Sequence, residues 1–174
     1  MAATPENVQK TALDTAGGSS GHDYSETNVQ VEGVDEADII KTDGDYIYTV
    51  DQSSVHIITS MPAADAEVIS TISYDYEPQG LFVNGDKMMV IGNERNNMVY
   101  DRIGFRPQSG MTYAHVYDVS NREEPELVAN YTFEGSYETA RMTNGNVYLV
   151  VESRPYDRSV HPMPIIMRDG AVES

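Results

Sequence analysis

Short runs of alternating apolar and polar residues follow one another along most of this chain. The run at 46–50, Tyr-Ile-Tyr-Thr-Val, is typical, because β-branched and aromatic residues suit a pleated surface with one buried face. Similar runs predict strands at 39–42, 54–59, 67–72, 80–83, 87–91, 111–119, 127–133, 137–142 and 147–151, and one more edge strand at 164–168. The pattern therefore predicts an all-β fold.

A turn pair followed by an apolar run occurs three times, at Asp43-Gly44, Asn84-Gly85 and Asn144-Gly145. Such pairs favour type I′ hairpin turns, in which both central residues need a positive φ. The pairs are 41 and 60 residues apart. The first spacing matches the roughly 40 to 45 residues of a four-stranded propeller blade. The second matches it once a long loop at 92–110 is inserted. A sandwich or barrel with three similar hairpins is the alternative.

The predicted domain organisation is a flexible, Gly/Ser-containing leader or linker at 1–27 and a partial β-propeller domain at 28–174. Its blades are four-stranded antiparallel sheets, about two and a half of them. The predicted blades are blade 1 at about 39–73, blade 2 at about 79–134 with the loop insert 92–110, and partial blade 3 at about 137–174. A closed propeller needs about four blades. We therefore expect an incomplete propeller, the N-terminal piece of a larger protein.

Composition limits the partners that this chain of 174 residues can be expected to bind. The net charge is −17, with 28 acidic residues against 11 basic ones, and such a field repels nucleic acid and anionic membrane surfaces. There is no Cys, which excludes disulfides, Cys-zinc sites and thiol nucleophiles. No run of about 18 apolar residues suggests a membrane span, and residues 1–10 do not have the pattern of a signal peptide.

The densest acidic cluster is a candidate calcium site. It comprises Asp35, Glu36, Asp38, Asp43 and Asp45. Carboxylate oxygens are the ligands that Ca²⁺ prefers. The spacing around Gly44 does not fit an EF-hand loop, whose acids alternate before its Gly. A hairpin turn with solvated acids explains the same residues. Apart from this Ca²⁺, the sequence predicts no cofactor.

Positive charge gathers in the predicted loop insert of this acidic chain. Arg95, Arg102 and Arg106 lie there with Tyr100 and Phe105, and these residue types are common binding anchors. They predict a site for an anionic or sugar-like ligand, and a disordered loop is the alternative. A second patch of the same character comprises Arg154, Tyr156, Arg158 and His161.

No set of residues predicts catalysis. The four histidines, His22, His56, His115 and His161, are far apart and have no metal-ligand spacing. His56 and His115 alternate with apolar residues, which places each on the less buried face of a strand. The nucleophile elbow Gly-x-Ser-x-Gly, the phosphate loop and the dinucleotide fingerprint are all missing from the sequence.

The stretch 27–44, TNVQVEGVDEADIIKTDG, closely resembles the opening signature of a family of secreted prokaryotic proteins. That family carries a β-propeller domain distantly related to WD40 repeats. Weaker matches follow in the right order at 116–137 and 140–150. The resemblance implies export, a propeller fold and no established activity, and it offers no catalytic residues. This chain departs from the family in length.

These observations favour a non-enzymatic scaffold or interaction module, exported or at the cell surface, that presents loops to a protein or glycan. Open blade faces and strand edges also predict self-association into dimers or larger oligomers. The alternative is a portion of a secreted hydrolase whose active site is completed by blades outside this chain. Bound metal, or a pocket that gathers carboxylates from several blades, would favour the hydrolase. A module stabilised by Ca²⁺ is a third hypothesis.

Overall fold

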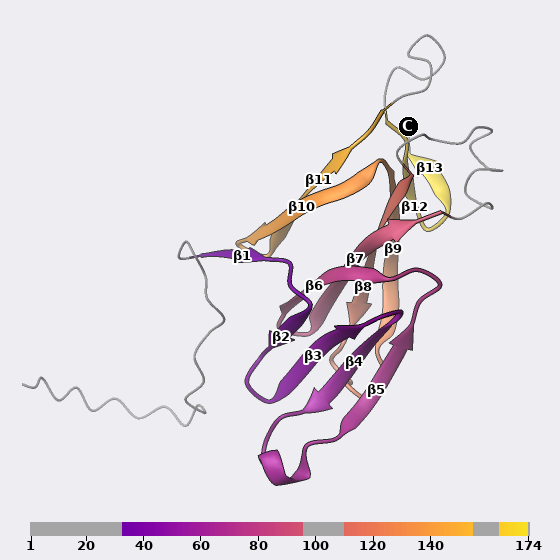
Figure 1. Cartoon of the computed structure of the whole chain (residues 1–174). Helices are drawn as coiled ribbons and strands as arrows, with labels where there is room; N and C mark the ends of the chain where they lie inside the picture. The colour runs from indigo at the N-terminus through magenta and orange to yellow at the C-terminus, as the bar shows by residue number, and fades with distance from the viewer. Residues whose placement is uncertain (1–32, 96–109, 155–163, 174) are drawn as a thin grey trace, which may run out of the picture.

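The computed structural model describes residues 33–95, 110–154 and 164–173, and it arranges them as three antiparallel sheets (Figure 1). The first sheet has the order β2-β3-β4-β5. Its strands are β2 (Ile40–Thr42), β3 (Tyr46–Asp51), β4 (Ser54–Thr59) and β5 (Val68–Ser73). The short 3-10 helix η1 (Ala63–Asp65) lies between β4 and β5. None of the three sheets closes into a barrel, so the all-β, incomplete-propeller prediction is confirmed.

The second sheet has six strands in the order β13-β12-β9-β8-β7-β6. They are β6 (Pro78–Asn84), β7 (Lys87–Glu94), β8 (Met111–Asp118), β9 (Glu126–Glu134), β12 (Ile166–Arg168) and β13 (Ala171–Glu173). The third sheet, in the order β1-β10-β11, has β1 (Val34–Glu36), β10 (Ser136–Thr143) and β11 (Asn146–Glu152). Among the described residues, no helix is long and apolar enough to cross a bilayer.

The core lies on both faces of the second sheet. Successive residues of a strand point to opposite faces, so Leu81 packs toward the first sheet while Phe82 packs toward the third. Met88 and Val90 join the first cluster, and Ile91 joins the second. Burial on both faces explains why β6 and β7 contain continuous apolar runs rather than an alternation. The three sheets are therefore stacked face to face, as propeller blades are.

Strand register corrects the predicted turn type at two of the three Gly corners. At Asn144-Gly145 both turn residues have positive φ, 51° and 73°, as a type I′ turn requires. In the other two hairpins the pairing places Gly44 or Gly85 first in the two-residue loop. Only that glycine has positive φ there, a pattern typical of type II′. These two hairpins differ from the one at Asn144-Gly145 because their strand pairing is shifted by one residue relative to the Gly.

The opening stretch 34–42 runs across all three sheets. Strand β1 pairs with β10 of the third sheet, Asp38 forms a bridge with Leu81 of the second, and β2 pairs with β3 of the first. Strand β1 was not predicted, because the acidic segment around Asp35 lacks apolar alternation. This stretch ties the three sheets together along one side of the stack (Figure 1).

The chain's last strands pair differently from the prediction. Residues 137–174 were expected to form a partial third blade, but β12 pairs with β9 and so extends the second sheet. Met167 lies opposite Thr132 and is almost fully buried. The third sheet instead gains β1 as its third strand. Alternation within a strand predicts which residues share a face, but not which strands are neighbours. The pairing of β12 with β9 and of β1 with β10 could therefore not be predicted from alternation.

Candidate functional site

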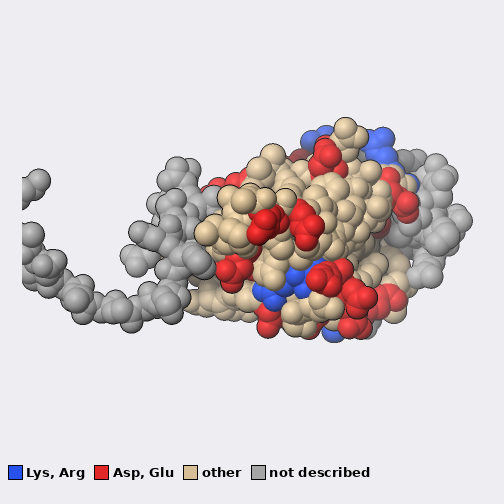
Figure 2. Space-filling view, turned by 90° about the horizontal axis from the view of Figure 1, so that it is seen from below, with Lys and Arg blue, Asp and Glu red and all other residues tan. Residues whose placement is uncertain are grey.

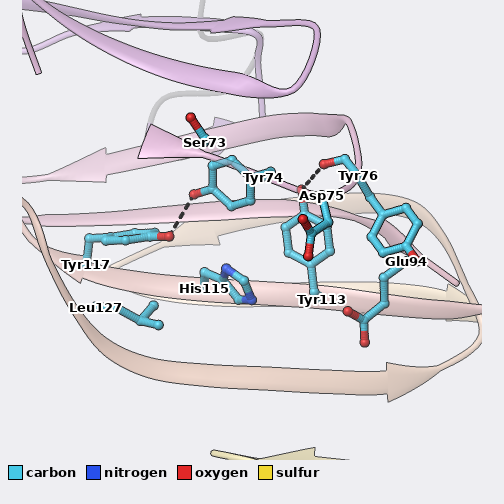
Figure 3. Close-up of a pocket in the computed structure, with 9 residues that line it drawn as sticks. All are labelled: Ser73, Tyr74, Asp75, Tyr76, Glu94, Tyr113, His115, Tyr117 and Leu127. Atoms are coloured by element: carbon cyan, nitrogen blue, oxygen red, sulfur yellow. Dashed lines mark hydrogen bonds between the residues drawn. The ribbon is translucent and has the colours of Figure 1, made fainter. Parts of the chain in front are cut away.

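A cavity of about 220 Å³ lies between the first and second sheets (Figure 3). We call it the tyrosine cavity. Its lining residues come from the end of β5, from the segment after it and from β7, β8 and β9: Ser73, Tyr74, Asp75, Tyr76, Glu94, Tyr113, His115, Tyr117 and Leu127. Two sheets and the connection between them therefore form its walls.

Strand β8 supplies the aromatic wall. Tyr113, His115 and Tyr117 alternate along it, so all three side chains point toward the first sheet. The rings of Tyr113 and His115 have centroids 4.8 Å apart, and Tyr74 stacks on Tyr113 at 5.7 Å. The Tyr74 hydroxyl donates to the Tyr117 hydroxyl at 3.0 Å. Burial raises the pKa of Tyr74 and of Tyr113 well above the usual tyrosine range, so these phenols stay protonated.

Two polar atoms in this cavity are buried without a hydrogen-bond partner among the described residues: Glu94 Oε1 and His115 Nδ1. Burial raises the pKa of Glu94, against a hydrogen bond with Thr132 that lowers it. Burial lowers the pKa of His115, against a hydrogen bond with Asn130 that raises it. His115 Nδ1 accepts a hydrogen bond when the ring carries its proton on Nε2, and it donates one in the other tautomer.

A second cavity, of about 260 Å³, shares Tyr76 and Glu94 with the first. Its other lining residues are Glu77, Gln79, Asn93, Arg95, Gly110, Met111 and Ser136. Arg95, a predicted ligand-binding residue, thus lies at a cavity, and its backbone carbonyl accepts a hydrogen bond from the Tyr76 hydroxyl at 2.9 Å. The other four members of that prediction, Tyr100, Arg102, Phe105 and Arg106, lie outside the described residues.

The predicted calcium ligands have separate partners. Asp35 pairs with Lys41 at 2.6 Å, and Glu36 pairs with Arg141 at 2.9 Å. Asp38 accepts a hydrogen bond from the backbone N–H of the next residue. Asp43 and Asp45 share one turn, in which Asp43 accepts from the Asp45 backbone N–H at 3.2 Å. Within the described part of the chain, no group of three or more His, Asp or Glu could hold a metal ion.

The remaining predicted residues are dispersed. His56 contacts Thr71 at 3.0 Å on the outer face of the first sheet. His115 was expected on the less buried face of its strand, but it faces the packed first sheet. Arg154 pairs with Glu152 at 2.8 Å. His22, Tyr156, Arg158 and His161 lie outside the described residues.

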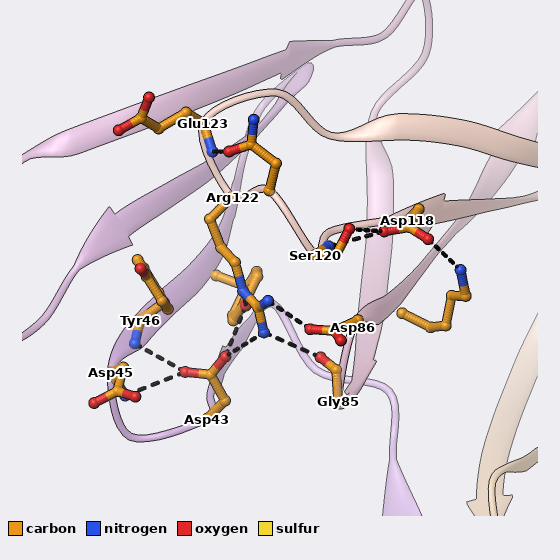
Figure 4. A network of polar contacts seen from close by, with 12 residues as sticks. Asp43, Asp45, Tyr46, Gly85, Asp86, Asp118, Ser120, Arg122 and Glu123 are labelled. Atoms are coloured by element: carbon orange, nitrogen blue, oxygen red, sulfur yellow. Dashed lines mark hydrogen bonds and ion pairs between the residues drawn. The ribbon is translucent and has the colours of Figure 1, made fainter.

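Sequence reasoning missed Arg122, which joins two Gly turns (Figure 4). It follows β8, and its guanidinium contacts Asp86 at 2.6 Å and Asp43 at 3.4 Å. It also donates to the Gly85 carbonyl and to the Tyr48 hydroxyl, both at 3.2 Å. Burial works against the charge of Arg122, but these bonds together raise its pKa. The signal available in the sequence was a single basic residue within an acidic turn. In the structure Arg122 links the first two sheets.

Acidic side chains dominate the surface around these features. Figure 2 shows one face of the molecule, with Asp and Glu spread over it and Lys and Arg in a few separate groups. None of the residues described as lining the tyrosine cavity is Lys or Arg. The field at the cavity therefore favours cations over anions.

Stacked antiparallel sheets of three to six strands, none of them closed, are the architecture of a β-propeller module. The sequence matches the family described as Beta propeller domain over residues 24–167, and the chain belongs to that family. An uncharacterized protein of Methanocaldococcus jannaschii is 34% identical over 134 residues, which are 77% of this chain and 18% of that protein. An uncharacterized protein of Archaeoglobus fulgidus is 33% identical over 132 residues, 75% of this chain and 19% of that protein. The chain thus spans about a fifth of these relatives. No solved structure matches it.

Proposed function

We propose that this chain is a non-enzymatic scaffold or interaction module, exported or at the cell surface, within a larger β-propeller protein. Its partners are proteins or glycans, and its outer sheet faces bind further β-sheets. In the larger protein those sheets are additional blades. In this chain on its own, a second copy takes their place.

The observation that carries the proposal is a pair of exposed apolar residues on the outer face of the third sheet. Val147 and Leu149 on β11 pack on the second sheet, so the alternate residues of this strand point away from it. Tyr148 and Val150 are 60% and 53% exposed there. The first sheet exposes Ile40 and Val68 on its two edge strands, β2 and β5. Neighbouring exposed apolar residues such as Tyr148 and Val150 suit an interaction surface.

The test is the oligomeric state of this chain and of a variant that carries both Tyr148→Lys and Val150→Lys. Light scattering at micromolar concentration should give a dimer or larger species for the unchanged chain and a monomer for the double variant. Ser53→Lys, in the exposed turn between β3 and β4, adds charge away from the sheet faces and should leave association unchanged. A monomeric mass for the unchanged chain at about 100 µM, well above a micromolar Kd, would contradict the proposal.

One observation favours the second candidate, a portion of a hydrolase. The tyrosine cavity gathers two carboxylates from different segments, Asp75 and Glu94, and the raised pKa of Glu94 suits a general acid. A panel of chromogenic aryl glycosides and esters tests this candidate. Hydrolysis by the unchanged chain that is lost in Glu94→Gln would favour the enzyme over the scaffold.

A further inference from the structure

We propose that the tyrosine cavity binds a primary ammonium group, from a small alkylamine or from a lysine side chain of a partner protein. This inference goes beyond the proposed function, because it concerns a site between two packed sheets rather than their outer faces. The cavity's hydrogen-bond acceptors, its charge and its size each support it.

The hydrogen bonds of the cavity require a ligand that donates. Glu94 Oε1 and His115 Nδ1 both lack a hydrogen-bond partner within the described residues, and the oxygens of an ionised Glu94 can only accept. Buried polar atoms left in this state need a partner, because each costs the folded protein its lost hydration. An ammonium group carries three donors and no acceptor, so it can donate to an unpaired acceptor without adding an acceptor of its own that needs a donor.

The numbers of hydrogen-bond donors and acceptors in the cavity wall also argue against a sugar ligand. A sugar hydroxyl accepts as well as donates, so it needs donors in the wall. Three of the four tyrosine protons are already committed. Tyr74 donates to Tyr117, Tyr113 to the Tyr76 carbonyl at 3.3 Å, and Tyr76 to the Arg95 carbonyl. The wall therefore offers acceptors in excess of donors, which suits an ammonium group better than a polyol.

Charge and aromatic surface favour a cation independently of hydrogen bonding. Glu94 and Asp75 are the charged residues among those described as lining the cavity, and both are acidic. A bound cation would offset the cost of burying an ionised Glu94. The faces of tyrosine rings attract cations by about 0.5 to 2 kcal/mol, depending on how far the cation is desolvated.

The size of the cavity indicates a head group rather than a whole ligand. At about 220 Å³ it is smaller than the roughly 300–1,000 Å³ of pockets that enclose drug-sized molecules. Ser73 at the end of β5 and Asp75 just after it are exposed, and so is Leu127 on β9. The cavity therefore reaches the surface at these residues, where an alkyl chain can extend to solvent.

The experiment is a calorimetric titration of the full chain with four probes. Butylammonium should bind, tetramethylammonium and methyl glucoside should bind much more weakly, and Nα-acetyl-lysine methylamide reports the lysine source. Glu94→Gln should weaken butylammonium binding about tenfold or more, because a hydrogen bond to a charged group is lost. Glu138→Gln is the matched control, because it removes an exposed acid of β10 outside both cavities. It should change the affinity less than about twofold.

Three results would overturn the inference. They are a methyl glucoside affinity equal to that of butylammonium, an unchanged affinity in Glu94→Gln, and no binding of either amine at about 20 mM, far above a millimolar Kd. If Glu94→Gln does not fold by circular dichroism, the order of the probes on the unchanged chain decides alone. Butylammonium bound more tightly than the lysine derivative indicates a free amine, and the reverse order indicates a partner's lysine. Failure here leaves the light-scattering result for the sheet faces unaffected.

Discussion

The ring of Tyr113 lies across Gly92, its partner on the neighbouring strand β7. A Cβ placed at Gly92 would lie 2.5 Å from the Tyr113 hydroxyl oxygen and 2.6 Å from the ring carbon that bears it. Such distances are too short for any contact between these atoms, and the buried ring stacks on Tyr74. At this residue pair, the missing side chain of glycine provides the space that the aromatic wall of the tyrosine cavity fills.

Gly92→Ala should therefore lower the free energy of unfolding by about 1–3 kcal/mol, the usual cost of overpacking a filled core. Urea denaturation measures the loss. In a Tyr113→Leu background the shorter side chain should remove most of the clash, so the alanine should cost less than about 1 kcal/mol there. An equal cost in both backgrounds would show that Tyr113 is not what Gly92 accommodates.

Part of the candidate site was within reach of sequence reasoning. Strict alternation predicts that Tyr113, His115 and Tyr117 share one face of a strand, and the structure places them so. That they face Glu94 and the segment at Tyr74 depends on how two sheets stack, and alternation within a strand carries no information about stacking. Arg122 was missed for the same reason, since its acidic partners lie 36 and 79 residues away in the chain.

At the scale of elements, one ion pair connects the strands at the start of the chain. Lys41 of β2 belongs to the first sheet and Asp35 of β1 to the third, and their charged atoms are 2.6 Å apart. The Lys41 side chain is only 8% exposed, while that of Asp35 is 30% exposed. A buried ammonium without its carboxylate would be costly, so this pair holds β1 near the first sheet.

Asp35→Asn should lower the free energy of unfolding by about 1–3 kcal/mol, because it leaves the Lys41 ammonium buried without its countercharge. Thermal or urea denaturation measures this loss in the free energy of unfolding. Adding Lys41→Met should recover much of the loss, since removing both partners leaves no unpaired charge. Glu152→Gln breaks the exposed pair with Arg154 and serves as the control, with an expected cost below about 1 kcal/mol. A loss in Asp35→Asn no larger than in this control would contradict the role given to the pair.

The strands themselves were largely predictable, and their pairing was not. The runs at 46–50 and 54–59 coincide closely with β3 and β4, because alternating β-branched and aromatic residues favour a pleated strand with one buried face. The short strand β1 and the attachment of β12 to β9 were not predicted. Both depend on contacts between segments about 30 to more than 100 residues apart, which the three-residue strands do not encode locally.

At the scale of the whole molecule, a net charge of −17 acts on three thin stacked sheets. The ion pairs between described residues are mostly exposed, and such pairs contribute little each. Repulsion among the excess acids acts over distances comparable to the Debye length, which is about 30 Å at 0.01 M salt and about 3 Å at 1 M. Added salt should therefore reduce the repulsion among the acidic side chains more than it weakens the ion pairs.

The unfolding temperature should accordingly rise as NaCl increases from about 10 mM to about 500 mM. CaCl₂ and MgCl₂ compared at equal ionic strength separate this screening from a specific calcium site. Asp35 and Glu36 already have cationic partners and Asp43 is bonded within its own turn and to Arg122, so binding Ca²⁺ would require breaking those contacts. We expect the two salts to give the same unfolding temperature. A rise specific to calcium at micromolar concentration would instead show that these acids rearrange around the ion, because Mg²⁺ binds flexible carboxylate clusters less readily.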